Sequence, residues 1–176
     1  AALYVAAEAP PLQGPGLETL MRKYTEVMAI IARLGRRYDE KVLEQMLYGR
    51  ALEGAALEDL EQVDAWMTEL AARLAGPAEA PRYELSLVHE AEKPGWEIRI
   101  ARRHHGVDTV RTLQKEFFES PEYRRIAALR TELADLVGPG AYVVRGEKRQ
   151  AVSSFREAVE WLMAEARKGQ AIQRYK

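Results

Sequence analysis

The sequence has no cysteine and no hydrophobic run long enough to cross a membrane. Without thiols the chain can form no disulfide, no thiolate zinc site and no cysteine nucleophile. No stretch approaches the ~18 uninterrupted apolar residues that a spanning helix requires, and no basic region leads into an apolar segment at the N-terminus. We therefore expect a soluble, cytoplasmic protein without a membrane partner.

Motifs for nucleotide binding and for common catalytic chemistry are missing as well. Neither the Walker pattern nor GxGxxG occurs, and no GxSxG elbow surrounds Ser153 or Ser154, which suit a helix cap. His89 is isolated in the sequence. The neighbouring His104 and His105 would point to opposite faces of a strand, so they could not easily ligate one metal. We expect no catalytic residue, no metal and no cofactor in this chain.

The composition is that of an ordinary globular protein. The 176 residues are 47% hydrophobic and 30% charged, and a chain of this size buries roughly 70% of the surface that its unfolded form exposes. The sequence begins at Ala1 instead of a methionine and stops at Arg174-Tyr175-Lys176. These ends suggest a piece excised from a longer protein, to which the function would then belong.

The first part of the chain has the apolar spacing of helices. Residues 3–7 predict a short strand, after which prolines and glycines interrupt regular structure. Apolar residues then recur at steps of three and four, which predicts helices over residues 17–34, 40–48 and 57–74. Gly35 fits the end of the first helix. Three amphipathic helices joined by short links should pack together as a helical subdomain of residues 1–76.

The second part begins with two segments in which polar and apolar residues alternate. Residues 83–87 and 96–100 predict strands, and Lys93-Pro94-Gly95 supplies the turn of an antiparallel hairpin. Because strands and helices are grouped, the sequence predicts an α+β fold, in which residues 77–176 form a smaller mixed part with antiparallel strands. The later predicted elements are a helix from Ser120-Pro121-Glu122 to Val137, a strand over 141–145, a helix from the capping box Ser154-Phe155-Arg156-Glu157 to Gly169, and a last strand.

Charge is unevenly distributed along the chain. Residues 1–76 carry 8 basic and 12 acidic side chains, whereas residues 99–176 carry 16 basic and 10 acidic ones. The second part should therefore attract a polyanion, and Lys or Arg side chains would supply salt-sensitive contacts to DNA phosphates. Segment 145–149 is the strongest candidate, because its glycine lets backbone amides approach; charge that merely solvates exposed surfaces is the alternative. The candidate DNA-binding residues are Arg102, Arg103, His105, Arg124, Arg125, Arg145, Lys148, Arg149, Arg174 and Lys176.

Several segments taken together resemble the DNA gyrase B subunit. More specifically, the chain is similar to the insert that interrupts the TOPRIM domain in the long, Gram-negative type of that subunit. The likeness covers essentially the whole chain, with departures at His104, Lys148 and Ala151. The segments that carry it are His105-Gly106-Val107-Asp108-Thr109, Glu122-Tyr123-Arg124-Arg125-Ile126, Arg145-Gly146-Glu147-Lys148-Arg149-Gln150 and Ile172-Gln173-Arg174-Tyr175-Lys176.

The resemblance implies an accessory domain of an ATP-dependent type II topoisomerase that negatively supercoils DNA. The parent, a heterotetramer of two A and two B subunits, uses ATP and Mg²⁺, but its ATPase, magnesium and DNA-cleaving groups lie outside these residues. The insert is expected to have no active site and to contribute to DNA binding, buttressing and coupling to the A subunit. Its partners would be DNA, the rest of gyrase B and gyrase A. One alternative is a protein–protein buttress without DNA contact, and a remoter one is an independent hydrolase that uses a histidine and a carboxylate.

Overall fold

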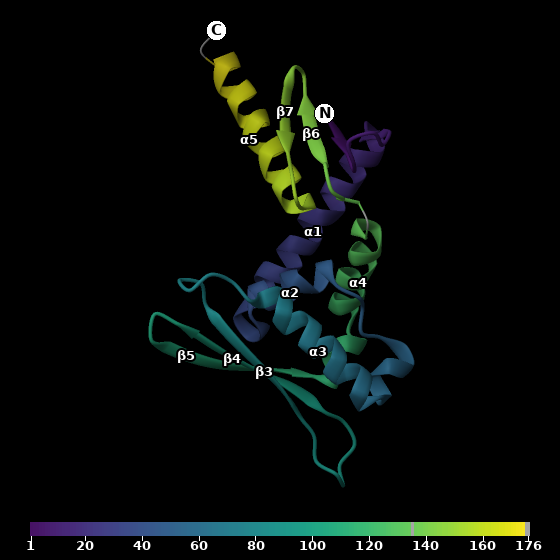
Figure 1. The fold of residues 1–176 in the computed structure, drawn as a ribbon, viewed down its shortest axis with the longest axis vertical. Helices are drawn as coiled ribbons and strands as arrows, with labels where there is room; N and C mark the ends of the chain where they lie inside the picture. The colour runs from purple at the N-terminus through teal and green to yellow at the C-terminus, as the bar shows by residue number, and fades with distance from the viewer. Residues whose placement is uncertain (135, 175–176) are drawn as a thin grey trace. The chain divides into compact units, whose positions relative to one another are not determined.

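The computed structural model describes residues 1–134 and 136–174 (Figure 1). Helices and antiparallel sheets make up the described chain, so the predicted α+β fold is confirmed. Contacts divide the chain into two compact units, Ala1–Thr25 with Glu132–Lys176, which we call the terminal unit, and Glu26–Thr131, the central unit. This division differs from the expected boundary after residue 76. It differs because the helix before that residue packs against the strand after it, so both belong to the central unit.

The terminal unit is built on an antiparallel sheet. Its elements are β1 (Ala2–Tyr4), β2 (Pro11–Gln13), β6 (Tyr142–Arg145), β7 (Lys148–Ala151), α5 (Phe155–Arg174) and the first part of α1 (Pro15–Tyr38). The strand order is β2-β1-β6-β7. Leu3 and Val143 pair across β1 and β6, and both side chains are fully buried. Helix α5 lies alongside β6, and its Leu162 side chain is also buried. Burial of these apolar groups holds the helix against one face of the sheet.

The start of α5 follows the capping signal in the sequence, with one change. Ser154 Oγ accepts a hydrogen bond from the Glu157 backbone N–H at 3.2 Å, as a capping box requires. The Glu157 carboxylate returns to Ser153, whose backbone N–H and hydroxyl donate to it at 2.9 and 2.8 Å. The helix does not end at Gly169 but continues to Arg174, so the expected last strand is wrong within the described residues. One helix-interior glycine costs only about 1 kcal/mol, which the rest of the long helix offsets.

The central unit combines helices with a second antiparallel sheet of order β3-β4-β5. Its elements are the remainder of α1, α2 (Glu40–Gln45), α3 (Leu60–Leu74), α4 (Pro121–Leu133, whose last residues enter the terminal unit), β3 (Arg82–Val88), β4 (Glu97–His104), β5 (Val107–Gln114), and the 3₁₀ turns η1 (Met46–Tyr48), η2 (Gly54–Glu58) and η3 (Lys115–Glu119). One face of the sheet buries Ile98, Ile100 and Leu113. α3 packs against β3 (Figure 1), and the other face of the sheet is solvent-exposed.

An aromatic cluster forms the heart of the central unit. Phe118 is 3% exposed, and its ring centroid lies 5.2 Å from that of Trp66, 5.5 Å from Trp96 and 4.9 Å from Tyr123. Polar atoms of the cluster are satisfied by the backbone: the two indole N–H groups donate to carbonyl oxygens, and the Tyr123 hydroxyl accepts from Leu52 N–H at 2.8 Å. Burial raises the pKa of Tyr123 to about 12. Residues 46–58 are thereby held against the core despite their irregular backbone.

Two further sequence expectations need correction. Gly35 does not end α1, which runs on to Tyr38; a Cβ at Gly35 would lie 2.9 Å from Glu40 Cβ, so the glycine instead permits the close approach of α2. The chain turns at Asp39, which has a φ of 83°. α4 ends at Leu133 and not at Val137, and Asp135 lies outside the described residues.

Three strands are absent from the sequence-based prediction, namely β2, β5 and β7, the last of which lies partly in the segment expected to be a loop. β2 begins at a proline, and prolines were read as interruptions; an edge strand tolerates one because it needs no ladder donor there. β5 follows β4 after a two-residue turn, and its Val- and Thr-rich sequence was a usable signal.

Candidate nucleic-acid interface

The β4–β5 hairpin presents the first group of candidate residues. His105 and Gly106 form its turn, with φ angles of 51° and 76°, the two positive values that a type I′ turn requires. On the strands beyond the turn, Arg103 and Asp108 pair across the hairpin at 3.1 Å. Their side chains are 66% and 69% exposed. Because such exposed pairs contribute little to stability, a phosphate can replace the carboxylate at low cost.

The two histidines lie side by side, contrary to the expectation that they face opposite sides of a strand. Their ring centroids are 3.9 Å apart. The expectation fails because His105 belongs to the turn, whereas the strand ends at His104. Desolvation, followed by the neighbouring His105 and Arg102, lowers the pKa of His104 below its usual value. The His104 imidazole is therefore mainly neutral near pH 7 and offers phosphate little charge.

Arg102 belongs to an internal polar cluster. Its side chain is 34% exposed, and its Nε lies 3.7 Å from Asp39 Oδ2. The Tyr83 hydroxyl donates to the same carboxylate, at 3.0 and 3.1 Å from its two oxygens. Burial, and then the Asp39 charge, raises the pKa of Tyr83 far above its ordinary value, so the hydroxyl remains a donor. Arg102 is consequently a weaker candidate for DNA contact than Arg103.

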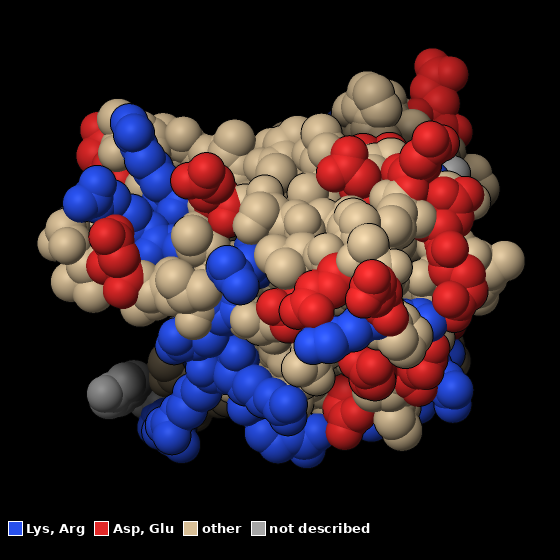
Figure 2. Space-filling model, turned by 90° about the horizontal axis from the view of Figure 1, so that it is seen from below, with Lys and Arg blue, Asp and Glu red and all other residues tan. Residues whose placement is uncertain are grey.

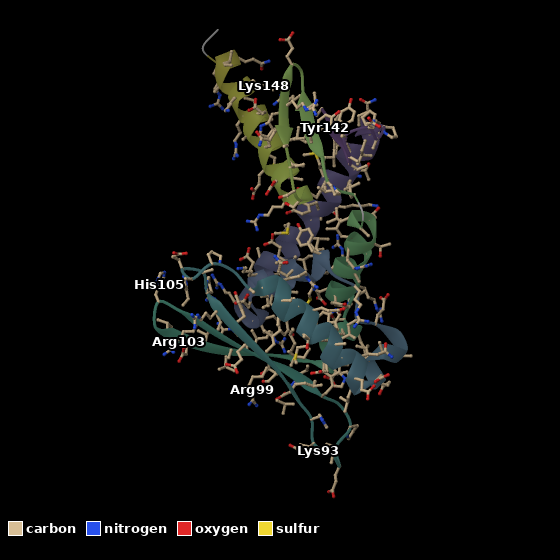
Figure 3. All side chains as sticks on the ribbon, in the orientation of Figure 1. Lys93, Arg99, Arg103, His105, Tyr142 and Lys148 are labelled. Carbon is tan, nitrogen blue, oxygen red and sulfur yellow. The ribbon has the colours of Figure 1, made fainter. Side chains whose placement is uncertain are left out.

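The outer face of the β3-β4-β5 sheet carries a row of arginines. The register sets Arg82 opposite Arg103, and Arg99 lies on the same face farther along β4 (Figure 3). Arg99 is 51% exposed, and one of its guanidinium nitrogens lies 3.8 Å from Glu97 Oε1. Directly opposed like charges destabilise a sheet, so an anion bound between Arg82 and Arg103 would relieve repulsion. Arg82 was missed as a candidate, although it stands one residue before the predicted strand 83–87.

Acidic side chains are interspersed with these arginines. In the view from below, the left part of the surface, where the β4–β5 turn lies, shows basic and acidic groups next to each other (Figure 2). Glu84 and Asp108 supply negative charge on the outer sheet face itself. The face is thus a mixed surface with exposed arginines, not a uniformly basic patch.

Two candidates lie on α4, also in the central unit. Arg124 and Arg125 are both exposed. A guanidinium nitrogen of Arg125 lies 3.1 Å from Glu26 Oε2, in a pair whose side chains are 55% and 51% exposed. This exposure leaves Arg125 accessible to an anion, as Arg124 is.

The β6–β7 hairpin presents the second group. Segment 145–149, expected to be a loop, is a tight hairpin turn in which Arg145 pairs with Lys148. Gly146 has a φ of 61°, at the first central position where a type II′ turn requires glycine. The turn alone is therefore sufficient to explain the glycine.

Lys148 connects this hairpin to α5. Its Nζ lies 2.8 Å from Glu165 Oε2, and Lys168 Nζ lies 3.2 Å from the other carboxylate oxygen. Glu165 is only 8% exposed. The hydrogen bond from Lys148, and then the one from Lys168, lowers the pKa of Glu165 below its ordinary 4.5. If Lys148 bound a phosphate instead, this carboxylate would keep fewer partners. Lys148 therefore contributes to the stability of the fold and is less available for DNA contact.

Replacing Glu165 with glutamine is expected to lower the melting temperature at pH 7 and to have a smaller effect at pH 3. The lowered pKa means that the stabilisation by Glu165 is present above pH 4.5 and is lost as the pH falls through the folded-state value. Thermal unfolding between pH 7 and pH 3 measures this. Glu160→Gln is the control, because its pair with Arg156 is half exposed. A Glu165→Gln deficit that persists unchanged at pH 3 would contradict the role of the ionised carboxylate.

Arg149 stands on the opposite face of the same hairpin. Its guanidinium carbon lies 3.6 Å from the ring centroid of Tyr142, and Tyr142 stacks on Tyr4 with centroids 4.5 Å apart and planes 9° apart. Tyr142 and Lys148 mark the two faces of the hairpin in Figure 3. The ring supports the flat side of the guanidinium and leaves its N–H edge for a phosphate. Arg149 is exposed and is the better phosphate candidate of this hairpin.

The remaining candidates are less informative. Arg145 is partly buried beneath α5, with a nitrogen 3.7 Å from where a Cβ of Gly169 would stand. Arg174 is the exposed last residue of α5. Lys176 lies outside the described residues.

Comparison with known families supplies the decisive observation. A family model described as the DNA gyrase B subunit insert domain matches residues 1–166, all but the last ten residues of the chain. The chain belongs to this family. The resemblance to this family is therefore confirmed, and three of the four sequence segments that carry it lie within the matched residues. The protein is an accessory part of gyrase B, a subunit of a type II topoisomerase.

Within this gyrase B insert domain, the structure brings Arg102, Arg103 and His105 together on the β4–β5 hairpin. It brings Arg145, Lys148 and Arg149 together on the β6–β7 hairpin. On each hairpin one basic residue is engaged with a poorly exposed carboxylate, Asp39 or Glu165, and another is exposed. The candidates thus form two local groups, one in each unit, and not one basic cluster.

Neither a cluster of metal ligands nor a membrane-spanning helix occurs among the described residues of the gyrase B insert domain. No group of three or more His, Asp or Glu side chains is arranged to hold a metal ion in residues 1–134 and 136–174. Over the same residues, every helix is too short or too polar to pass through a membrane.

Proposed function

We propose that the insert domain is a non-catalytic accessory domain that contacts DNA when gyrase holds its substrate, chiefly through Arg99, Arg103 and Arg149. The observation that carries this proposal is the presentation of these side chains: each is exposed on a hairpin strand whose geometry is fixed by a tight turn. Their partners are the partly exposed Glu97, the exposed Asp108 and an aromatic ring, which a phosphate can displace or accompany at little cost. Such contacts position DNA without reading its sequence.

On this proposal the insert carries out no chemical step. ATP, Mg²⁺ and the DNA-cleaving group of the topoisomerase are bound or supplied by other parts of gyrase. The insert adds phosphate contacts to those parts and couples them to the A subunit. Because each contact is weak alone, the isolated domain has low DNA affinity, and the contacts gain effect only when the rest of gyrase holds the same duplex.

A second function is favoured by the ion pairs of the basic residues. Arg102, Arg125 and Lys148 all lie within 4 Å of a carboxylate of the chain itself. Side chains that are already paired contribute to shape and rigidity, which a buttress between gyrase subunits also needs. In this alternative the insert touches protein and not DNA, and supercoiling depends on it through geometry alone.

DNA titrations of reconstituted gyrase at several salt concentrations distinguish the two functions. The test variant combines Arg99→Ala, Arg103→Ala and Arg149→Ala, and the control combines Lys23→Ala, Arg50→Ala and Lys93→Ala, which removes equal charge from exposed ion pairs elsewhere. We expect the test variant to lose affinity and to reduce the slope of log K against log salt by about 0.9 per lost phosphate contact. The control should leave the slope unchanged. Equal slopes in both variants would reject direct contact and leave the buttress.

A further inference from the structure

β5 is the free edge of the central unit's sheet. In the described chain it pairs with β4 on one side and with no strand on the other. The hydrogen bond from Lys115 N–H to the Trp96 carbonyl, at 3.1 Å, fixes which residue pairs of this antiparallel ladder are bonded. By the alternation of such ladders, Val110, Thr112 and Gln114 direct their N–H and C=O groups away from β4. The edge therefore offers unpaired donors and acceptors along most of its length.

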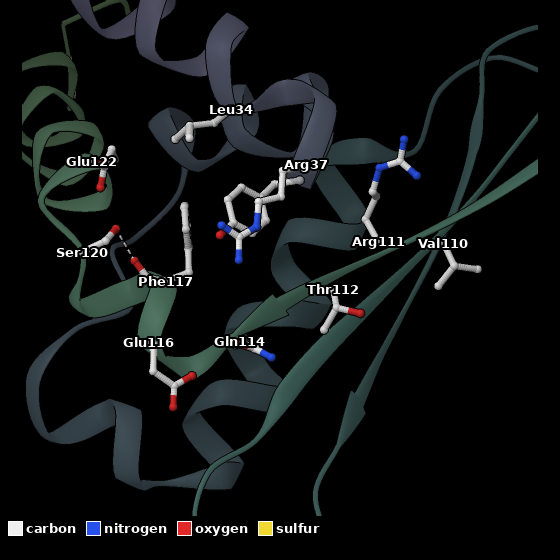
Figure 4. A pocket seen from close by; sticks show the side chains of 11 residues that line it. Leu34, Arg37, Val110, Arg111, Thr112, Gln114, Glu116, Phe117, Ser120 and Glu122 are labelled. Atoms are coloured by element: carbon white, nitrogen blue, oxygen red, sulfur yellow. Dashed lines mark hydrogen bonds between the residues drawn. The ribbon is translucent and has the colours of Figure 1, made fainter.

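A groove of about 540 Å³ runs beside this edge. Its second wall is the last part of α1, from which Arg37 reaches into the groove, while Leu34 lies on the side of Phe117 and Glu122 (Figure 4). Val110 is 57% exposed. The segment Val107–Gln114 contains no proline or lysine, two of the residues that commonly protect edge strands from pairing. A strand edge facing a helix across an open groove is the arrangement into which an extended peptide adds as a new strand.

The charges along the groove select the kind of occupant. Arg37 and Arg111 lie on the side of Val110, and the Nε of Arg111 is held by a hydrogen bond of 3.0 Å to the Arg36 carbonyl. Glu116 and Glu122 line the other end. A nucleic-acid backbone would bring phosphates against both carboxylates. A peptide can instead place an acidic side chain at the arginines and an uncharged or basic one at the glutamates.

We propose that this groove binds an extended acidic segment of a partner protein, which joins the β3-β4-β5 sheet as a fourth strand next to β5. From Val110 to Gln114 the edge is roughly 13 Å long, at about 3.3 Å per residue, so about five residues of the segment pair with it. Backbone hydrogen bonds to Val110, Thr112 and Gln114 supply the affinity, and an acidic side chain against Arg37 and Arg111 supplies the selectivity. The site borders the outer sheet face proposed for DNA, because Thr112 lies opposite Arg99 in the strand register, but neither Arg99 nor Arg103 lines the groove.

Chemical-shift titration of the ¹⁵N-labelled chain tests the site with two defined probes. One is a blocked ten-residue peptide in which glutamates alternate with threonine and isoleucine, and the other has lysine in place of every glutamate. We expect the acidic peptide to shift the amide signals of residues 110–114 and the lysine peptide to bind at least about tenfold more weakly. The absence of shifts in residues 110–114 at millimolar acidic peptide would overturn the proposal.

Two variants separate edge pairing from general attraction. Val110→Pro removes an outward N–H and blocks the edge without breaking a β4 hydrogen bond, and we expect it to abolish binding. Val110→Thr keeps the N–H and should bind like the parent. Arg37→Glu should weaken acidic-peptide binding at least about tenfold. Because Arg37 lies outside the sheet, this variant still tests the proposal if the proline variant does not fold. Unchanged binding of the acidic peptide by a folded Val110→Pro chain would overturn the proposal, and so would unchanged binding by the Arg37→Glu chain. Displacement of the peptide by a DNA duplex would also overturn it.

Discussion

Phe118→Ala is expected to lower the free energy of unfolding of the central unit by about 3 to 5 kcal/mol. Phe118 is 3% exposed and makes tilted or edge-to-face contacts with Trp66, Trp96 and Tyr123. Truncation removes apolar contact and leaves a cavity that rings anchored to the backbone by hydrogen bonds cannot collapse to fill. The large effect follows from this anchoring as much as from the lost area.

Urea unfolding followed by tryptophan fluorescence measures this loss, because two of the ring's neighbours are tryptophans. Phe118→Leu is the matched control, since it keeps most of the apolar volume and should cost only about 1 to 2 kcal/mol. If alanine and leucine at this position were equally stable, the aromatic cluster could not be the rigid core described above.

Asp39→Ala is expected to cost about 2 to 4 kcal/mol, a large effect for a polar residue at a helix junction. Three roles meet in this side chain. It accepts from Val42 N–H at 3.0 Å as the N-cap of α2, it accepts from the Tyr83 hydroxyl, and it lies near Arg102. Its own φ of 83° is also unfavourable for alanine. Alanine therefore loses the cap, leaves two half-buried polar groups with fewer partners and adds backbone strain.

Thermal and urea unfolding of three variants separate these contributions. Asp39→Asn keeps a capping oxygen and tolerates positive φ, so it should lose about 1 kcal/mol. Asp39→Gly removes the side chain but relieves the strain, and should fall between asparagine and alanine. Equal stability of all three would show that Asp39 does not join α2 to the sheet.

Helices were predictable from the sequence because their apolar spacing is a local property. The residues that end or join helices were not, because their roles depend on distant neighbours. Gly35 resembles a residue that ends a helix, yet it lies inside α1, where its missing side chain leaves room for Glu40. Asp39 belongs to no recognisable sequence motif. Its role depends on contacts with Tyr83 and Arg102, which only the folded structure shows.

The residue types of the candidate interface were predictable from the sequence. Which of these side chains are exposed and free to contact DNA was not. Sequence reasoning placed basic residues correctly in the second part of the chain and could not distinguish exposed from engaged ones. Lys148 and Arg149 are neighbours in sequence, but strand alternation sends one to Glu165 and the other to Tyr142. The division of the chain into units was also beyond local pattern, since it follows from α3 packing against β3.

The central claim, that the insert helps gyrase hold DNA, is tested most directly by removing it. Gyrase would be reconstituted with residues 1–176 replaced by a short Gly/Ser linker, and DNA binding and supercoiling would be measured in parallel with intact gyrase. We predict that both activities fall together. Full binding with lost supercoiling would contradict direct DNA contact in favour of a buttress, and full activity in both assays would contradict the functional account altogether.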